Sequence, residues 1–408
     1  MPRLGLGLNT FYSESGAQLR SGADTTTFIS TWTTTGSDET VTLPFVDDSN
    51  SISFTIDWGD GGTDDVTAHD DDLGEGAIDH VYGTADTYTI TISGTISGLQ
   101  FNNGGDRTKI KTITQWGTCN LSTNAAFYGC SALEISATDA PTVSTTSLFS
   151  MFRDCSTITG IGGEWDIDGV TNLQRTFDGC TNFNGDITTW DTSAVTTLRE
   201  TFENAAAFNK DITRDGVKWD TGEVTNFYLA FDGCTAFNGD IGNWDVAKGT
   251  NFTSMFVSCT NFNQDIDSWN VSAGTAFTGM FASATSFNQS LNSWTLNTSA
   301  GVSLVSMFSG STSFNGNITS WNVSRVTGMK RMFKNANAFN QDLSAWDFDD
   351  VTGTSLGFNE FMNGKTGGNV MSTANYNALL VQIEASNAET NLVFDGGGAE
   401  PTGAGDTA

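Results

Sequence analysis

Apolar residues recur through the middle of the chain with a period of about 25 residues. A column of ten phenylalanines runs from Phe127 to Phe358, and the steps between its members are 25, 25, 25, 29, 25, 25, 27, 25 and 25. Eight of the eleven tryptophans keep the same register, from Trp165 to Trp346. A fixed period of this length is typical of repeat proteins, in which each unit buries its apolar face only against its neighbours. We therefore expect about ten stacked repeats over residues 101–362.

Two spacings of apolar residues alternate within each repeat. Val170, Leu173, Phe177, Cys180 and Phe183 are spaced as on one face of a short helix. In the segment WDV at residues 244–246, the two apolar residues share a side, as they do in a strand. The pattern predicts a helical turn or two, a bend and a short strand in every repeat. The fold class that follows is an α/β right-handed solenoid, like that of leucine-rich repeats, with a parallel sheet along one side.

The recurrent side chains are predicted to hold the stack together. Aromatic columns would form spines in the core, where their large buried area stabilises the fold. A buried Asn at each bend would bond the backbone of its own repeat and of the next. The central members of these structural columns are Phe177, Phe202, Phe231, Phe256, Phe281; Trp190, Trp219, Trp244, Trp269, Trp294, Trp321; and Asn184, Asn209, Asn238, Asn263, Asn288.

Two further columns carry groups that could do chemistry. The repeated aspartates Asp186, Asp211, Asp240, Asp265 and Asp342 are expected to brace the start of each strand, with a ladder of calcium-bridged carboxylates as the alternative. Five of the six cysteines lie three residues after a column Phe, where other repeats have Ala or Ser. This exchange indicates a small, buried and reduced side chain, although disulfides between adjacent repeats are the alternative.

The repeat unit resembles a known family. Its form, roughly V-T-x-M-x-x-M-F-x-x-C-x-x-F-N-x-D-I-x-x-W-D-V, closely resembles a surface-protein repeat of unknown function first grouped from mycoplasma lipoproteins and related to BspA-like leucine-rich repeats. The resemblance covers about residues 105–362. It implies extracellular display and adhesion without catalysis. Thr176, Thr201 and Ala230 stand where Met is usual, and residues 130–160 lack the Phe-Asn pair.

Residues 25–100 have a different pattern. Alternating runs such as SISFTIDW and DTYTITISGTI, separated by turn signals, predict an antiparallel β-sandwich. The segments DWGDGG and HVYGTADTYTITI resemble the immunoglobulin-like polycystic kidney disease (PKD) domain, which implies that His80 and Tyr82 pack against the WGDG turn. An acidic loop, HDDDLGEG at residues 69–76, lies between these two segments; a solvated surface is its simpler interpretation and a calcium site the alternative. Its calcium candidates are Asp70, Asp71, Asp72 and Glu75.

The two ends of the chain are expected to differ from the repeats. Residues 1–24 are interpreted as an N-terminal docking arm. In residues 363–408, the segment STANYNALLVQIEAS predicts a helix that closes the stack, NLVFDGGG predicts a last strand, and the remainder is a polar tail. The N-terminus lacks the long apolar run of a secretory signal, and no segment reaches the length of a membrane span.

Composition restricts the classes of function. The formal net charge of −30 repels phosphate backbones, so we expect no nucleic-acid partner. The sequence has two histidines, no nucleophile triad and no phosphate-binding loop, so we expect no enzyme and no cofactor, with calcium as the possible exception. A glycan-acting enzyme with paired carboxylates is the remote alternative.

Two non-enzymatic hypotheses remain. The first is a bacteriophage virion protein, such as a fibre, spike or head decoration, at the virion surface. Its N-terminal arm would bind other virion proteins, and its repeats would bind a host-surface glycan or protein; we expect a homo-oligomer. The opening RLGLGLN weakly resembles short N-terminal stretches of phage particle proteins. The second is an extracellular adhesin on the bacterial cell surface, exported by an unrecognised route.

Overall fold

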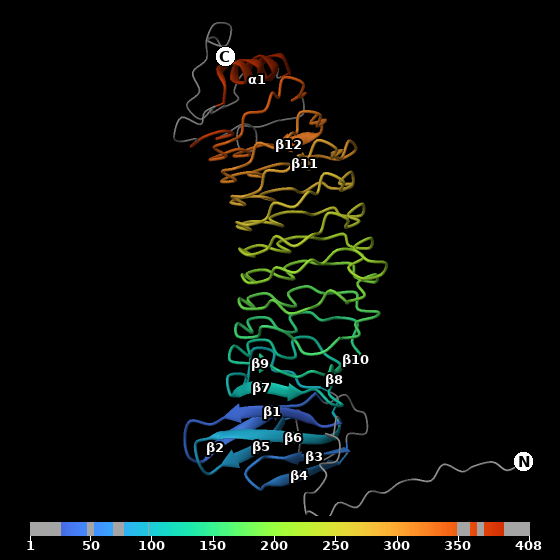
Figure 1. Cartoon of the computed structure of the whole chain (residues 1–408), viewed down its shortest axis with the longest axis vertical. Helices are drawn as coiled ribbons and strands as arrows, with labels where there is room; N and C mark the ends of the chain where they lie inside the picture. Colours follow the sequence, from blue (N-terminus) through green and yellow to red (C-terminus); the bar gives the residue numbers. More distant parts are fainter. Residues whose placement is uncertain are drawn as a thin grey trace, which may run out of the picture.

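An antiparallel β-sheet region forms the N-terminal part of the structure. The computed structural model describes residues 26–46, 53–67, 77–96, 98–348, 360–364 and 371–386. A six-stranded sheet has the order β4-β3-β6-β1-β7-β9, and a two-stranded sheet pairs β2 with β5 (Figure 1). The strands are β1 (Phe28–Thr33), β2 (Glu39–Pro44), β3 (Ser53–Asp57), β4 (Thr63–Thr67), β5 (Ala77–Tyr82), β6 (Thr87–Thr95), β7 (Ile110–Gln115) and β9 (Glu134–Ile135).

Alternating burial explains these strands. In β6, Tyr88, Ile90 and Ile92 are buried while the threonines between them are more exposed, as the period of a half-buried strand requires. The predicted antiparallel sheet is therefore confirmed. β7 was expected to belong to the repeats, but it pairs antiparallel with β1, and β9 pairs parallel with β7. The six-stranded sheet thus leads the chain directly into the stacked region.

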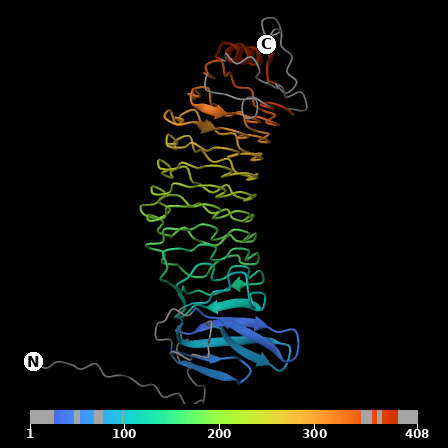
Figure 2. The same cartoon turned by 180° about the vertical axis from the view of Figure 1, so that it is seen from behind.

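Successive segments of about 25 residues stack on one another above this sheet, and we call each segment a coil (Figures 1 and 2). Backbone bonds join each coil to the next: the N–H of Phe177 donates to the O of Thr201 at 2.9 Å, and that of Phe231 to the O of Met255 at 2.9 Å. The continuous parallel sheet that we predicted is wrong, because the pairing is mostly reduced to single parallel bridges. These bridges join Ser147, Asn172, Thr197, Asn226, Asn251, Ala276 and Ser303 in turn.

Besides β7 with β9, two short parallel pairs among the described residues are the exceptions. β10 (Thr142–Val143) pairs with β8 (Asn120–Leu121), and β11 (Val302–Ser303) pairs with β12 (Val326–Gly328). Each pair lies near one end of the stack, as Figure 1 shows. Between them, the coils are held by turns and by hydrogen bonds to the coils on either side.

The helical turns predicted within each repeat are also wrong, although the predicted apolar residues are buried. Between Leu173 and Cys180, every second backbone N–H donates to the next coil and not to its own. The N–H of Thr176 donates to the O of Leu173 at 3.1 Å within the coil, whereas that of Arg175 donates to the O of Arg199 in the next coil. A helical ladder cannot form with this alternation. Two left-handed residues cause it, since Arg175 has a φ of 58° and Gly179 a φ of 74°.

This pair of left-handed residues recurs from coil to coil, always four residues apart. The pairs are Ala125 and Gly129, Ser150 and Asp154, Arg175 and Gly179, Glu200 and Asn204, Leu229 and Gly233, Ser254 and Ser258, Gly279 and Ser283, Ser306 and Gly310, Arg331 and Asn335, and Glu360 and Gly364. The last pair is centred on Met362, which therefore holds the position that we assigned to Phe358. Phe358 itself lies outside the described residues.

The WDV segment shows the predicted alternation but forms no strand. Trp244 and Val246 are buried, and Asp245 is partly exposed. The N–H of Trp244 closes a turn on the O of Ile241 at 3.1 Å, so it cannot enter a strand ladder. The indole carries the bond to the preceding coil instead, from Nε1 to the O of Ile212 at 2.7 Å.

Helix α1 (Thr373–Ser386) lies at the far end of the stack (Figure 1). Ser372 caps it, since its Oγ accepts the N–H of Asn375 at 3.3 Å. Tyr376, Leu379 and Ile383 are buried, which confirms the predicted helix and its apolar face. No helix in the described ranges has the length and hydropathy that crossing a membrane requires. The predicted arm at residues 1–24 and the strand and tail predicted after residue 390 lie outside these ranges.

Candidate functional site

The two aromatic columns form spines through the coils. The described column phenylalanines are at most 1% exposed, and the rings of Phe202 and Phe231 stack with centroids 5.3 Å apart. Trp219 and Trp244 stack at 6.0 Å, and the Nε1 of each donates to a carbonyl of the preceding coil. Ring contacts join the central members of each spine in sequence order. One series is Phe177, Phe202, Phe231, Phe256 and Phe281, and the other is Trp190, Trp219, Trp244, Trp269, Trp294 and Trp321.

The asparagine column lies at the surface and not in the core, where we expected it. The side-chain O of each Asn accepts the backbone N–H of the next Asn, and these bonds range from 2.7 to 3.0 Å. Its members Asn184, Asn209, Asn238, Asn263 and Asn288 are all exposed. The predicted bond between coils is thus present, but an exposed ladder replaces the buried one. At the end of the stack, Asn340 accepts the N–H of Ser372 at 2.8 Å, so the ladder continues to α1.

The repeated aspartates brace turns, since the structure forms no strand at their position. The carboxylate of Asp186 accepts the N–H of Thr188 at 3.0 Å and its hydroxyl at 2.7 Å, and these bonds lower the pKa of Asp186. Asp240, Asp265 and Asp342 each accept the N–H two residues further on. Among the residues that the structure describes, no group of three or more His, Cys, Asp or Glu side chains is placed to hold a metal ion.

The column cysteines are buried and unpaired with one another, as predicted. The Sγ of Cys234 donates to the O of Phe202 at 2.8 Å, and that of Cys259 to the O of Phe231 at 2.9 Å. Burial raises the pKa of both thiols well above its ordinary value. In another coil, the hydroxyl of Ser311 donates to the O of Phe281 in the same way. Ala205, Ala284 and Ala336 are buried at the same position, so this column needs a small side chain and not a reactive thiol.

In the N-terminal region, His80 has the packing role that we expected. Its ring stacks on Trp58 with centroids 4.6 Å apart, and its Nε2 lies 2.8 Å from the Oδ2 of Asp60. The contact with His80 lowers the pKa of Asp60. The hydroxyl of Tyr82 donates to the O of Trp58 at 2.8 Å. The calcium candidates Asp70, Asp71, Asp72 and Glu75 lie outside the described residues.

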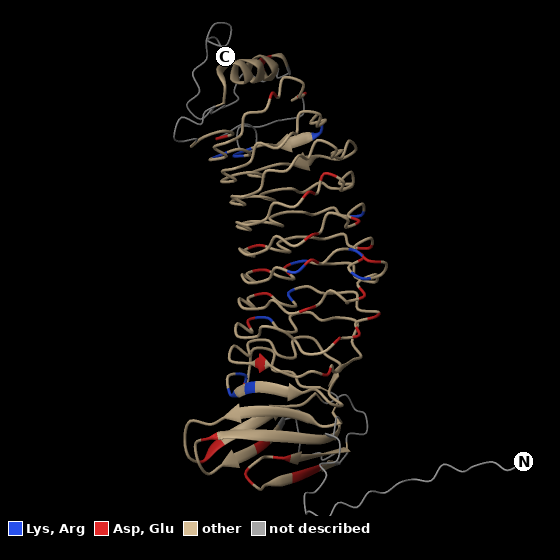
Figure 3. Ribbon diagram, viewed as in Figure 1, with Lys and Arg blue, Asp and Glu red and all other residues tan. Residues whose placement is uncertain are grey.

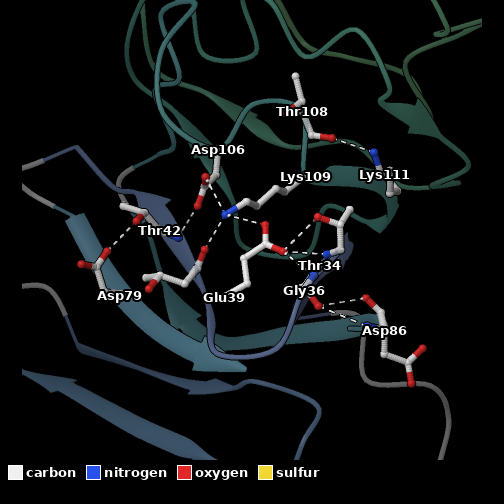
Figure 4. A network of polar contacts seen from close by, with 12 residues as sticks. Thr34, Gly36, Glu39, Thr42, Asp79, Asp86, Asp106, Thr108, Lys109 and Lys111 are labelled. Carbon is white, nitrogen blue, oxygen red and sulfur yellow. Dashed lines mark hydrogen bonds and ion pairs between the residues drawn. The ribbon is translucent and has the colours of Figure 1, made fainter. Parts of the chain in front are cut away.

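A polar network joins the β1–β2 turn to the start of β7 (Figure 4). The Nζ of Lys109 lies 3.0 Å from the Oδ1 of Asp106 and 3.2 Å from the Oε1 of Glu39. Glu39 also accepts the N–H groups of Thr35 and Gly36, and these bonds, with Lys109, lower its pKa to about 2. The network fixes the first coil against the sheet, so we assign it a structural role.

A band of paired charges lies on one face of the coils between residues 150 and 235 (Figure 3). Glu200 is 2% exposed and accepts hydrogen bonds from Arg175 and from Arg199, the second at 2.9 Å to the Nη2. Nearby, Asp178 lies 3.0 Å from the Nε of Arg153. Burial, together with the neighbouring carboxylates, raises the pKa of Glu203 to about 7.

A surface hollow of about 200 Å³ adjoins this band. It is lined by Arg199, Asn226, Tyr228 and Asn251, which come from three successive coils. The guanidinium of Arg199 lies over the ring of Tyr228, 5.2 Å from its centroid. The side-chain O of Asn226 accepts the N–H of Tyr228 at 3.0 Å, which fixes the backbone beneath the ring.

Sequence reasoning missed Arg199 and Tyr228 because neither belongs to a recurrent column. Both occupy the position three residues before the column Phe, which we call the variable position. Its described occupants are Asn124, Phe149, Gln174, Arg199, Tyr228, Thr253, Thr278, Val305 and Lys330. Aligning the repeats at this position would have shown an adjacent Arg and Tyr.

Comparisons with known proteins bear on the coils. The family model described as "Mycoplasma protein of unknown function, DUF285" matches residues 146–218, 213–303 and 295–367. Comparison with curated proteins and with solved structures found no match. The three matched segments together span more than half of the 408 residues and coincide with the stacked coils. The chain therefore belongs to the DUF285 family.

Proposed function

We propose that the protein is a non-enzymatic display and adhesion scaffold, in which the coils present a binding surface and the N-terminal region acts as a base. At the finer level, we interpret the stack as a right-handed solenoid like that of leucine-rich repeats, and the N-terminal sheets as a PKD-like sandwich. The stacking of Trp219 on Trp244 and the coil-to-coil hydrogen bonds support the first interpretation. The contacts of Trp58, His80 and Tyr82 support the second.

The observation that carries the proposal is the bonding of the variable position. Its backbone is fixed: the carbonyl O of Arg199 accepts the N–H of Arg175, that of Tyr228 accepts the N–H of Glu200, and that of Thr253 accepts the N–H of Leu229. The side chains at this position are all exposed or partly exposed and differ widely in size and charge. A constant backbone with changing side chains is the arrangement that repeat proteins use for recognition.

The surface on which the scaffold is displayed is the second part of the proposal. We favour the virion of a bacteriophage, with the bacterial cell surface as the alternative. The high net negative charge of −30 favours solubility in either setting, and the same charge argues against nucleic acid as the partner. On the virion, other particle proteins and further copies of this chain would be the neighbours.

Peptide mass spectrometry tests the location. Gradient-purified virus particles and washed cell surfaces from the same source culture are digested and compared. We expect stoichiometric recovery of the chain in the particles. Recovery from cell surfaces only would reject the virion and favour the adhesin. Recovery from neither, with the chain found in the soluble cell extract, would overturn the proposed display function.

A further inference from the structure

We propose that the hollow beside Tyr228 binds a neutral pyranose sugar. This inference rests on the proposed function, because it names the ligand class for the scaffold. Four side chains of different character meet there, namely a ring, a guanidinium and two amides: Tyr228, Arg199, Asn226 and Asn251. Sites that recognise small polar ligands combine one large flat surface with a few fixed polar groups.

One face of the Tyr228 ring is covered by Arg199. The next side chain at the variable position does not cover the other face. Arg199 of the preceding coil lies over the ring, and Glu200, which is buried, holds Arg199 through bonds of 3.0 and 2.9 Å to its Nε and Nη2. In the following coil the variable position is Thr253, whose side chain is too small to cover an aromatic face. Tyr228 is accordingly only partly buried.

An aromatic face of this kind suits the C–H side of a sugar ring. The face of the ring carries negative charge density, so it attracts the weakly positive hydrogens on one side of a pyranose. The amides of Asn226 and Asn251 supply the polar part. Each uses its oxygen for a backbone N–H, that of Tyr228 at 3.0 Å and that of Thr253 at 3.0 Å, so the amide nitrogens are the groups directed to hydroxyl oxygens of a ligand.

The electrostatics of the hollow favour a neutral ligand over an acidic one. Arg199 is bound at 2.9 Å by the buried carboxylate of Glu200, which also binds Arg175. Glu203 and Asp232 add two further carboxyl groups in the same two coils. With a net charge of −30 on the whole chain, a sialic acid or a phosphorylated sugar would be repelled.

Saturation-transfer NMR on the full chain tests the proposal. The probes are the methyl glycosides of glucose, galactose and mannose, and N-acetylglucosamine, each at about 10 mM, because a shallow site and a ligand of this size give a Kd of about 1 mM. We expect transfer to the ring C–H protons of at least one sugar. Transfer should fall at least about fivefold in Tyr228→Ala and persist in Tyr228→Phe, which keeps the aromatic face.

Two further variants separate binding from folding. Thr253→Phe adds a ring at the variable position of the next coil and should abolish transfer by covering Tyr228, with the melting temperature unchanged. Tyr128→Ala removes the other tyrosine that an arginine covers, Arg153 at 5.0 Å, and should leave transfer intact. The proposal fails if none of the four sugars shows transfer, or if Tyr228→Ala and Thr253→Phe bind as the unchanged chain does. Either result leaves the location experiment standing, because mass spectrometry finds the chain whatever its ligand.

Discussion

Replacing Trp244 tests whether the indole column stabilises the stack. The side chain is 3% exposed and lies between Trp219 at 6.0 Å and Trp269 at 6.4 Å. Truncating a buried Trp to Ala lowers the free energy of unfolding by about 3–5 kcal/mol. The change also removes the Nε1 donor and leaves the O of Ile212 unsatisfied, which costs about 1–3 kcal/mol more. We therefore expect a loss of at least about 4 kcal/mol for Trp244→Ala.

Trp244→Phe separates these two contributions. It keeps most of the buried ring and removes only the donor, so we expect a loss of about 1–3 kcal/mol. Urea unfolding followed by circular dichroism gives the free energies. Hydrogen exchange then shows whether the loss is confined to coils near residue 244, as nearest-neighbour stacking requires. A loss below about 1 kcal/mol for Trp244→Ala would refute the spine, and a Trp244→Phe chain as stable as the parent would refute the role of the indole bond.

Three further predictions concern single positions. Burial disfavours the ionised form of Glu203, whose pKa is raised from 4.5 to about 7, so the contribution of this group to stability falls as pH rises through that interval. Glu203→Gln should therefore raise the melting temperature at about pH 8 and change it little at about pH 4, and equal effects at both would contradict the assignment. Cys234→Ser should change stability by less than about 1 kcal/mol, because Ser311 makes the equivalent bond to Phe281; a large fall in a thermal melt would show that the thiol is specifically needed. Gly239→Ala places a Cβ 2.0 Å from the O of Lys210, so it should cost about 1–3 kcal/mol and exceed the loss in Gly242→Ala, where the nearest atom is 2.7 Å away; the reverse order in parallel melts would be inconsistent with this packing.

The repeat columns were predictable because their side chains pack together in the core. Phe177, Trp190 and Cys180 are buried at the period that the sequence shows, and any structure that stacks 25-residue units must bring such residues into register. The same argument could not predict whether the column asparagines are buried or exposed. Asn238 bonds the next coil as predicted but does so at the surface, since a ladder of amide oxygens and backbone N–H groups requires register and not burial.

The local conformation was predicted wrongly because burial at positions i, i+3 and i+7 does not distinguish a helix from a series of tight turns. The distinguishing signal was present in the residue before each column Cys or Ala, where Gly179, Asn204, Gly233 and Ser258 all have positive φ. Gly and Asn favour this conformation, and their recurrence at one position is typical of turns. The pairing of β1 with β7 had no local signal, because its partners are about 80 residues apart in sequence.

The hollow beside Tyr228 was not predictable from one repeat, since it depends on what three successive coils place side by side. The backbone at each of these coils is already satisfied: the N–H of Tyr228 binds Asn226, and its O binds the N–H of Glu200. Substitution at the variable position therefore breaks none of the backbone bonds that hold the coils together, whereas substitution of Trp244 removes both packing and a hydrogen bond. In the proposed function, stability and recognition therefore reside in different positions of the same coil. Under that proposal, a new ligand requires only new neighbours at the variable position, on a backbone that does not change.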